Sequence, residues 1–153
     1  MTEELRRTVK ERELEESVRF LGHRDDVPDL MTAADLFVFP SLYEGLGGAL
    51  IEAMALSLPI VASRIPVFEE CLEDGGNAVL VAPESPEGLA AAVGGLLESE
   101  EEMDRFRRRG REIFCHRFTL ESSVTRLVEL YERVATGSGA SDPYDNAVGA
   151  DRA

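Results

Sequence analysis

The sequence predicts an α/β fold with a parallel sheet of about four strands, flanking helices and a helical C-terminal region. Short apolar runs alternate with segments of helical periodicity over roughly the first half of the chain. These runs are continuously apolar, which is typical of parallel strands buried on both faces. Strands and helices that alternate in this way indicate right-handed crossovers between parallel neighbours.

The elements follow in order along the chain. A charged, amphipathic helix is expected over residues 2–16. The predicted strands are Val18–Gly22, Leu36–Phe39, Pro59–Ala62 and Ala78–Val81. The helices expected between them are Pro28–Ala34, Gly47–Leu58 and Val67–Leu72.

Three helices are predicted after the last strand. The first is capped by Ser85 with Pro86 at its first position, the second covers about 101–116, and the third is capped by Thr119. Residues from Thr136 onward have little to bury, so we expect one incomplete domain over 1–135 and a disordered tail over 136–153.

Charge and composition exclude several classes of function. The formal net charge of -14 argues against nucleic acid or anionic lipid as a partner. Apolar stretches are too short for a membrane span, and no signal-peptide pattern opens the chain, so a cytoplasmic location is expected. Cys71 and Cys115 are far apart in sequence, and no cluster with metal-ligand spacing is present, so no metal site is predicted.

Candidate ligand-binding loops follow the strands, because ligands bind parallel sheets beyond the carboxyl ends of their strands. These positions come after Gly22, after Pro40 and after Ser63. The second is the most informative, since a glycine-rich loop there leads into a helix. Unpaired amides of Gly47, Gly48 and Ala49 at the start of that helix would form an anion site suited to a diphosphate.

Two carboxylates flank this predicted anion site. Glu44 precedes it in the loop, and Glu52 lies one helical turn beyond Gly48. Carboxylates accept hydrogen bonds from sugar hydroxyls, so the pair would suit the two polyols of a nucleotide sugar. Glycine loops before helices are also common, and glutamate near a helix N-terminus favours the helix dipole, so spacing alone leaves a purely structural interpretation open.

The combined string resembles the E-x7-E segment of retaining GT-B glycosyltransferases of the family 4 type. The resemblance is carried by Tyr43–Gly47, Glu52–Ala55 and Leu58–Ala62. It continues upstream through Val18–Gly22 and Ala33–Ser41, and downstream through Pro66, Glu69, Gly76, Asn77 and Val81–Pro83. Such a protein would carry a partial Rossmann-like sheet, the C-terminal donor-binding domain of the GT-B fold.

The resemblance also implies roles for individual residues. Glu44 would act in catalysis by contacting hydroxyls of the donor sugar, while Glu52 would bind the ribose. Backbone at Leu46, Gly47, Gly48 and Ala49 would hold the sugar and diphosphate, and the backbone near Arg24 would meet the base. The reaction would transfer a sugar from a nucleotide-diphosphate donor with retention, with no metal and no separate cofactor.

The resemblance covers only part of such an enzyme, roughly Val18 to Tyr131. The acceptor-binding half and the first two strands of the donor domain lie outside it, so the chain alone is expected to be inactive. A complementary chain could supply the missing half. Without those strands the inner edge of the Leu36–Phe39 strand would be open, to be filled by a partner polypeptide or by the Val18–Gly22 strand.

Two further functions remain alternatives from the sequence. One is a catalytically inactive relic or binding module that keeps the fold and acts with a partner chain. The other is a sugar-nucleotide epimerase of related architecture, which the E-x7-E string disfavours. Ser63–Pro66 replaces a glycine pair frequent in the family, and Gly48 replaces a bulkier apolar residue, so the choice of donor cannot be predicted.

Overall fold

The computed structural model describes residues 2–136. Its helices are α1 (Thr2–Glu11), α2 (Val27–Thr32), α3 (Gly48–Ala55), α4 (Pro66–Glu69), α5 (Pro86–Leu97), α6 (Glu100–Arg117) and α7 (Leu120–Thr136). Its strands are β1 (Phe37–Phe39), β2 (Ile60–Ser63) and β3 (Ala78–Val81). The tail predicted for 136–153 lies outside the described residues, apart from Thr136, which ends α7.

The three strands form one parallel sheet in the order β1-β2-β3. Val61 in β2 pairs with Val38 in β1 on one side and with Val79 in β3 on the other. All four residues of β2 are buried, as expected for a central parallel strand covered on both faces. The predicted α/β class with a parallel sheet is therefore confirmed, as are three of its four strands.

The predicted strand Val18–Gly22 is wrong. This segment is irregular in the structure and forms part of the connection between α1 and α2, without sliding against β1. Its Leu21 side chain is 52% exposed, and the ring of Phe20 lies 4.9 Å from the Arg6 guanidinium. A strand needs hydrogen-bonded neighbours, and residues 18–22 pair with no strand among the described residues.

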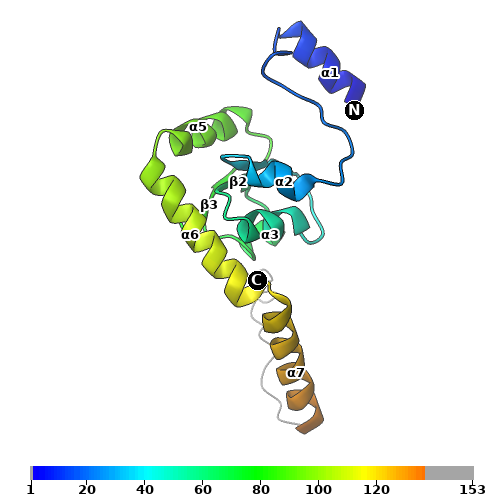
Figure 1. Ribbon diagram of the computed structural model, residues 1–153, viewed down its shortest axis with the longest axis vertical. Coiled ribbons are helices and arrows are strands. Elements are labelled where there is room, and N and C mark those ends of the chain that lie inside the picture. The colour runs from blue at the N-terminus through cyan, green and yellow to red at the C-terminus, as the bar shows by residue number, and fades with distance from the viewer. Residues whose placement is uncertain (1, 137–153) are drawn as a thin grey trace, which may run out of the picture.

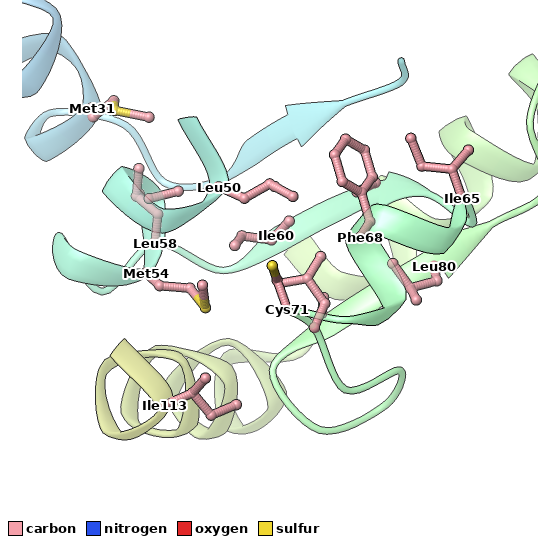
Figure 2. Packing of buried hydrophobic residues seen from close by; sticks show 14 residues of the cluster. Met31, Leu50, Met54, Leu58, Ile60, Ile65, Phe68, Cys71, Leu80 and Ile113 are labelled. Atoms are coloured by element: carbon pink, nitrogen blue, oxygen red, sulfur yellow. The ribbon is translucent and has the colours of Figure 1, made fainter. Parts of the chain in front are cut away.

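Alternate residues of the strands point into two apolar layers. Ile60, Ala62 and Leu80 face the layer formed with α3 and α4, where Figure 2 shows Leu50 and Phe68 packed beside them. Val61 faces the opposite layer, which α5 and α6 cover with side chains that include Leu96 and Phe106. The period of two along each strand thus directs its side chains into a core on both faces.

Helix α6 connects the two layers. Met103 and Phe106, in its first half, pack with Val61, whereas Ile113 lies in the other layer near Met54 (Figure 2). Ser99 caps this helix by accepting a hydrogen bond from the amide of Glu102. No helix within residues 2–136 is long and apolar enough to cross a bilayer.

Helix α7 extends away from the sheet, while α1 is set apart and joined to α2 by a long connection (Figure 1). None of the α7 residues is buried. Its apolar side chains nevertheless recur at helical spacing along one stripe, and Leu120, Tyr131 and Val134 are each more than 60% exposed. Within the described part of the chain, this stripe has no apolar surface covering it.

Candidate functional site

A left-handed glycine opens α3 at the carboxyl end of the sheet. Gly47 is the N-cap, with φ 67° and ψ 36°, a conformation that residues with a Cβ seldom adopt. Its carbonyl accepts a hydrogen bond from the amide of Leu50 at 2.8 Å. The amides of Gly48 and Ala49 donate to no acceptor among residues 2–136. The amides of Gly48 and Ala49, two of the three for which an anion site is predicted, are therefore available at the helix N-terminus, and the anion site itself stays a prediction.

The aromatic ring of Phe68 lies against Gly47, on the side where a side chain would project. A Cβ built on Gly47 would lie 3.2 Å from Phe68 Cε1, whereas one on Gly48 would meet nothing within 4 Å. Phe68 is fully buried and stacks on Phe39, with ring centroids 5.2 Å apart. One ring thus links α4 and β1 to the loop that opens α3.

Helix α4, which carries Phe68, is held by Arg64 at the end of β2. The Arg64 guanidinium contacts Glu69 at 3.3 Å, pairs with Asp74, and donates to the carbonyl of Leu80 at 3.1 Å. Burial alone would raise the pKa of Asp74, but bonds from the Leu80 amide and from Arg64 outweigh it and lower that pKa. Arg64, which directly follows β2, is therefore turned toward its own chain.

Glu44 is half-buried and oriented by a serine. The hydroxyl of Ser41 donates to Glu44 Oε1 at 3.0 Å, which fixes one carboxylate oxygen and leaves the other without a protein donor among the described residues. Tyr43 and Leu46, on either side, are 87% and 70% exposed. Glu44 therefore presents an accessible carboxylate oxygen, and Ser41 fixes the position of the carboxylate within the loop. This geometry is compatible with the role predicted for Glu44.

Glu52 is exposed on α3, one turn beyond Gly48. Since residues four apart share a helix face, its carboxylate lies on the same side of α3 as Gly48. Leu46, Gly47, Gly48, Ala49 and Glu52 therefore belong to one continuous loop and helix, with Glu44 just ahead of them.

Arg24 is not brought into this group by any described contact. It lies in the connection before α2, and its guanidinium is bound by two hydrogen bonds to Asp26, one of them 2.6 Å long. That bond to Asp26 raises the pKa of Arg24. The role predicted for the backbone near Arg24 remains a prediction.

Three supporting features did not emerge from the sequence. Phe68 and Arg64 reach the site through tertiary packing, which has no local pattern. Ser41 could have been noticed, because it stands three residues before Glu44 within a loop.

A cavity of about 310 Å³ also opens at the carboxyl ends of the strands, and its walls include Pro40, Leu42, Ser63 and Val81.

Comparison with known proteins gives a consistent result. The family model described as "Glycosyl transferases group 1" matches residues 1–113. The chain is 36% identical over 110 residues to MMP alpha-(1->4)-mannosyltransferase from Mycolicibacterium hassiacum, which covers 71% of this chain and 27% of that protein. It is 33% identical over 137 residues to phosphatidyl-myo-inositol mannosyltransferase from Mycolicibacterium smegmatis, covering 88% of this chain and 35% of that protein.

Among solved structures, the chain is similar to HepE from Anabaena in complex with UDP. The TM-score is 0.81 at 29% identity, and the match covers 86% of this chain and 36% of HepE. The chain thus spans about a third of the length of these relatives. Its parallel sheet and flanking helices correspond to part of a GT-B glycosyltransferase. From the family model and these similarities, the chain belongs to the glycosyl transferases group 1 family.

Proposed function

We propose that this chain is the donor-binding part of a retaining glycosyltransferase that uses a nucleotide-diphosphate sugar. In this proposal the free amides of Gly48 and Ala49 bind the diphosphate, with the backbone of Leu46 and Gly47 alongside. Glu52 accepts hydrogen bonds from the ribose. The carboxylate of Glu44 accepts hydrogen bonds from hydroxyls of the transferred sugar, and the backbone near Arg24 meets the base.

The opening of α3 is the observation that carries this proposal. Gly47 adopts the left-handed conformation that leaves two amides free, and Phe68 holds it there. Amides fixed before the ligand arrives need no reorganisation when negative charge develops on a leaving diphosphate. HepE, which the chain resembles over 86% of its length, was crystallised with UDP and with UDP-glucose, a donor of the proposed class.

The proposed reaction requires more protein than these 153 residues. The relatives are about three to four times as long as the matched part, and the acceptor must be bound by the remainder. A net charge of -14 also repels a diphosphate unless cationic groups elsewhere neutralise it. We therefore propose that tight donor binding and transfer need a complementary part, on the same polypeptide or on a second chain.

An inactive binding module is the second candidate, and the net charge of -14, which disfavours a bound diphosphate, is the observation that favours it. Such a module would keep the loop and helix without turnover. The two candidates differ in one outcome, because only the enzyme transfers sugar when the complementary part is present.

Calorimetric titration of the isolated chain with UDP, GDP and ADP, followed by a transfer assay, tests the proposal. The isolated chain should bind with a Kd of about 1 mM or weaker. The chain co-expressed with the rest of the M. smegmatis relative should bind at least one nucleotide more tightly and release it from a donor sugar. Micromolar binding by the chain alone would contradict the need for a complementary part. Nucleotide binding without turnover would favour the inactive module.

A further inference from the structure

The cavity at the carboxyl ends of the strands lies on the face of the sheet that α5 covers. Val81 and Leu89, which line it, pack against the apolar layer beneath α5 and α6. Ser63 follows Val61 by two residues in β2, so its side chain faces the same layer. The proposed diphosphate site opens α3, whose buried side chains pack in the opposite layer. The cavity is therefore separate from that site.

The hydroxyl of Ser63 has no protein partner. Ser63 is 2% exposed, and its Oγ forms no hydrogen bond within residues 2–136. In this part of the chain, no fully enclosed side-chain nitrogen or oxygen lacks a partner, so the Oγ must reach open space. The cavity is the space that Ser63 lines. A hydroxyl buried in this way loses bonds to water, and a ligand in the cavity would replace them.

Glu84 lines the same cavity in a strained backbone conformation. Its φ is 56°, in the left-handed region that glycine adopts without strain. Its exposed carboxylate forms no hydrogen bond or ion pair with a described residue. Strained residues of this kind gather at ligand sites, where the surrounding structure holds them in place. Glu84 thus supplies a free acceptor at the mouth of the cavity.

The remaining walls of the cavity are largely apolar. Leu42, at the opening, is 60% exposed, and Pro40 and Pro86 lie on the two sides. The volume of about 310 Å³ is near the lower end of the range for small-molecule sites. A matching ligand is therefore small and combines an apolar face with groups that donate and accept hydrogen bonds.

We propose that this cavity binds a neutral saccharide ring. The C–H groups on one face of the ring pack against Leu42, Val81 and Leu89. Its hydroxyl groups exchange a hydrogen bond with Ser63 Oγ and donate to the carboxylate of Glu84.

Charge and hydrogen bonding select this class of ligand. No lysine, arginine or histidine lines the cavity, and Glu84 together with the net charge of -14 repels phosphates and carboxylates. A purely apolar ligand would leave the Ser63 hydroxyl without a partner. An organic cation would be attracted to Glu84, and its binding is an outcome that the experiment below separates from the proposal.

The cavity adjoins the loop that carries Glu44. Leu42 stands in this loop, two residues before the proposed catalytic carboxylate, and also lines the cavity. In the proposed enzyme, the bound saccharide would be one unit of the acceptor. That role rests on the proposed function, whereas the saccharide site itself does not.

Nuclear magnetic resonance titration of the isolated chain with maltose and with methyl α-mannoside tests the site. Glucose 1-phosphate and choline are the anionic and cationic comparisons. Ser63→Ala and Glu84→Ala each remove one polar group from the cavity. Glu87→Ala is the matched control, because Glu87 is an exposed glutamate in the first turn of α5 that does not line the cavity.

Urea denaturation of each variant separates loss of binding from loss of the fold. Ser63→Ala should not lower stability, because the hydroxyl that it removes has no protein partner. If Ser63→Ala nevertheless fails to fold, Glu84→Ala carries the test.

We expect at least one of the two saccharides to shift the amide resonances of Ser63, Val81 and Glu84 most strongly, with a Kd of about 1–10 mM. Ser63→Ala and Glu84→Ala should weaken this binding by about fivefold or more, and Glu87→Ala should leave it within about twofold. No shifts around the cavity at about 100 mM saccharide would overturn the proposal. So would unchanged binding by both cavity variants, or tighter binding of choline or glucose 1-phosphate than of either saccharide.

Titration of the same samples with UDP, GDP and ADP separates this inference from the proposed function. If saccharide binds at the cavity but no nucleotide binds at Gly48 and Ala49, the saccharide site stands and its role as an acceptor site fails with the proposed function. If a nucleotide binds at those amides but no saccharide binds at the cavity, the proposed function stands and the saccharide site fails.

Discussion

The ring of Phe68 occupies the space beside Gly47, so that a Cβ on this glycine would lie 3.2 Å from Phe68 Cε1. Contacts this short are rare, and a fully buried ring stacked on Phe39 has little room to move. Gly47 therefore meets two requirements, a left-handed backbone and the absence of a side chain. The conformation of the proposed diphosphate site depends on both.

Gly47→Ala should destabilise the chain by about 1–2 kcal/mol or more, because alanine disfavours the left-handed region and its methyl crowds the ring. Gly48→Ala is the matched control. Gly48 has no positive φ and open space around its Cβ position, so the change should be neutral or slightly stabilising at the start of α3. Urea denaturation of both variants measures the difference. Equal stability of the two would show that Phe68 does not constrain Gly47.

Ser57→Gly should stabilise the chain. Helix α3 ends with the Leu58 amide bonded to the Ala53 carbonyl at 2.9 Å and the Ser57 amide bonded to that of Met54 at 3.1 Å, the pattern that places a left-handed residue after a helix. Ser57 holds φ 58°, which glycine adopts without strain. We expect a gain of about 0.5–1 kcal/mol after the larger unfolded-state entropy of glycine is included.

Thermal melting of Ser57→Gly and Ser57→Ala provides the comparison for this helix end. The alanine variant keeps a Cβ in the left-handed position and should show no gain. A glycine variant that melts no higher than the alanine variant would mean that the backbone at this position is not strained.

The Glu73–Arg109 pair predicts a pH dependence. Arg109 binds the Glu73 carboxylate in a bidentate contact, in which Nε donates at 2.9 Å and Nη2 at 2.8 Å. These hydrogen bonds lower the pKa of the Glu73 carboxyl group. A carboxyl group with a depressed folded-state pKa stabilises the fold above its unfolded pKa, and this stabilisation is lost as the pH falls. Glu73→Gln should therefore lower the melting temperature at neutral pH.

The difference in melting temperature between wild type and Glu73→Gln should shrink as the pH falls from about 5 to 3, where the carboxyl group takes up its proton. Both side chains are about half exposed, so the difference should be small and should also shrink in high salt. Comparing the variant with wild type at each pH removes the effect of the net charge of the chain. A difference that is independent of pH would exclude the ion pair as its cause.

Glu44 and Glu52 should have separable effects in the assembled enzyme. Glu52→Ala should weaken binding of both donor and free nucleotide, because its proposed ligand, the ribose, is common to the two. Glu44→Ala should lower kcat more than it weakens nucleotide binding, because its proposed ligand is the transferred sugar. Steady-state kinetics and nucleotide titration measure both effects. If both variants weaken free-nucleotide binding equally, the assignment of the two carboxylates is wrong.

Local sequence patterns predict the elements whose formation depends mainly on residues close to them in the chain. The apolar runs around Val38, Val61 and Val79 indicate buried parallel strands, and the structure contains all three. Ser85 caps α5 through the amide of Gly88, as its position before Pro86 predicts. In each case the element that the pattern predicts is present in the structure.

Elements that depend on distant partners could not be predicted in this way. The run Val18–Gly22 has the composition of a strand, but strand formation also requires pairing, and this segment pairs with no strand among residues 2–136. Arg64 holds Asp74 ten residues away, and Phe68 reaches Gly47 from another helix. These contacts arise from tertiary packing, so the glycine loop could be predicted while its support could not.

Nuclear magnetic resonance titration of the isolated chain with UDP, GDP and ADP tests the central claim most directly, because it locates even millimolar binding at individual amides. The claim predicts that at least one nucleotide shifts the amide resonances of Gly47, Gly48 and Ala49 most strongly, with Glu52 next. The same titration of Glu52→Ala, at matched ionic strength, should give weaker binding at the same amides. Shifts confined to other parts of the chain, or none at tens of millimolar nucleotide, would contradict the claim that this loop and helix bind the donor.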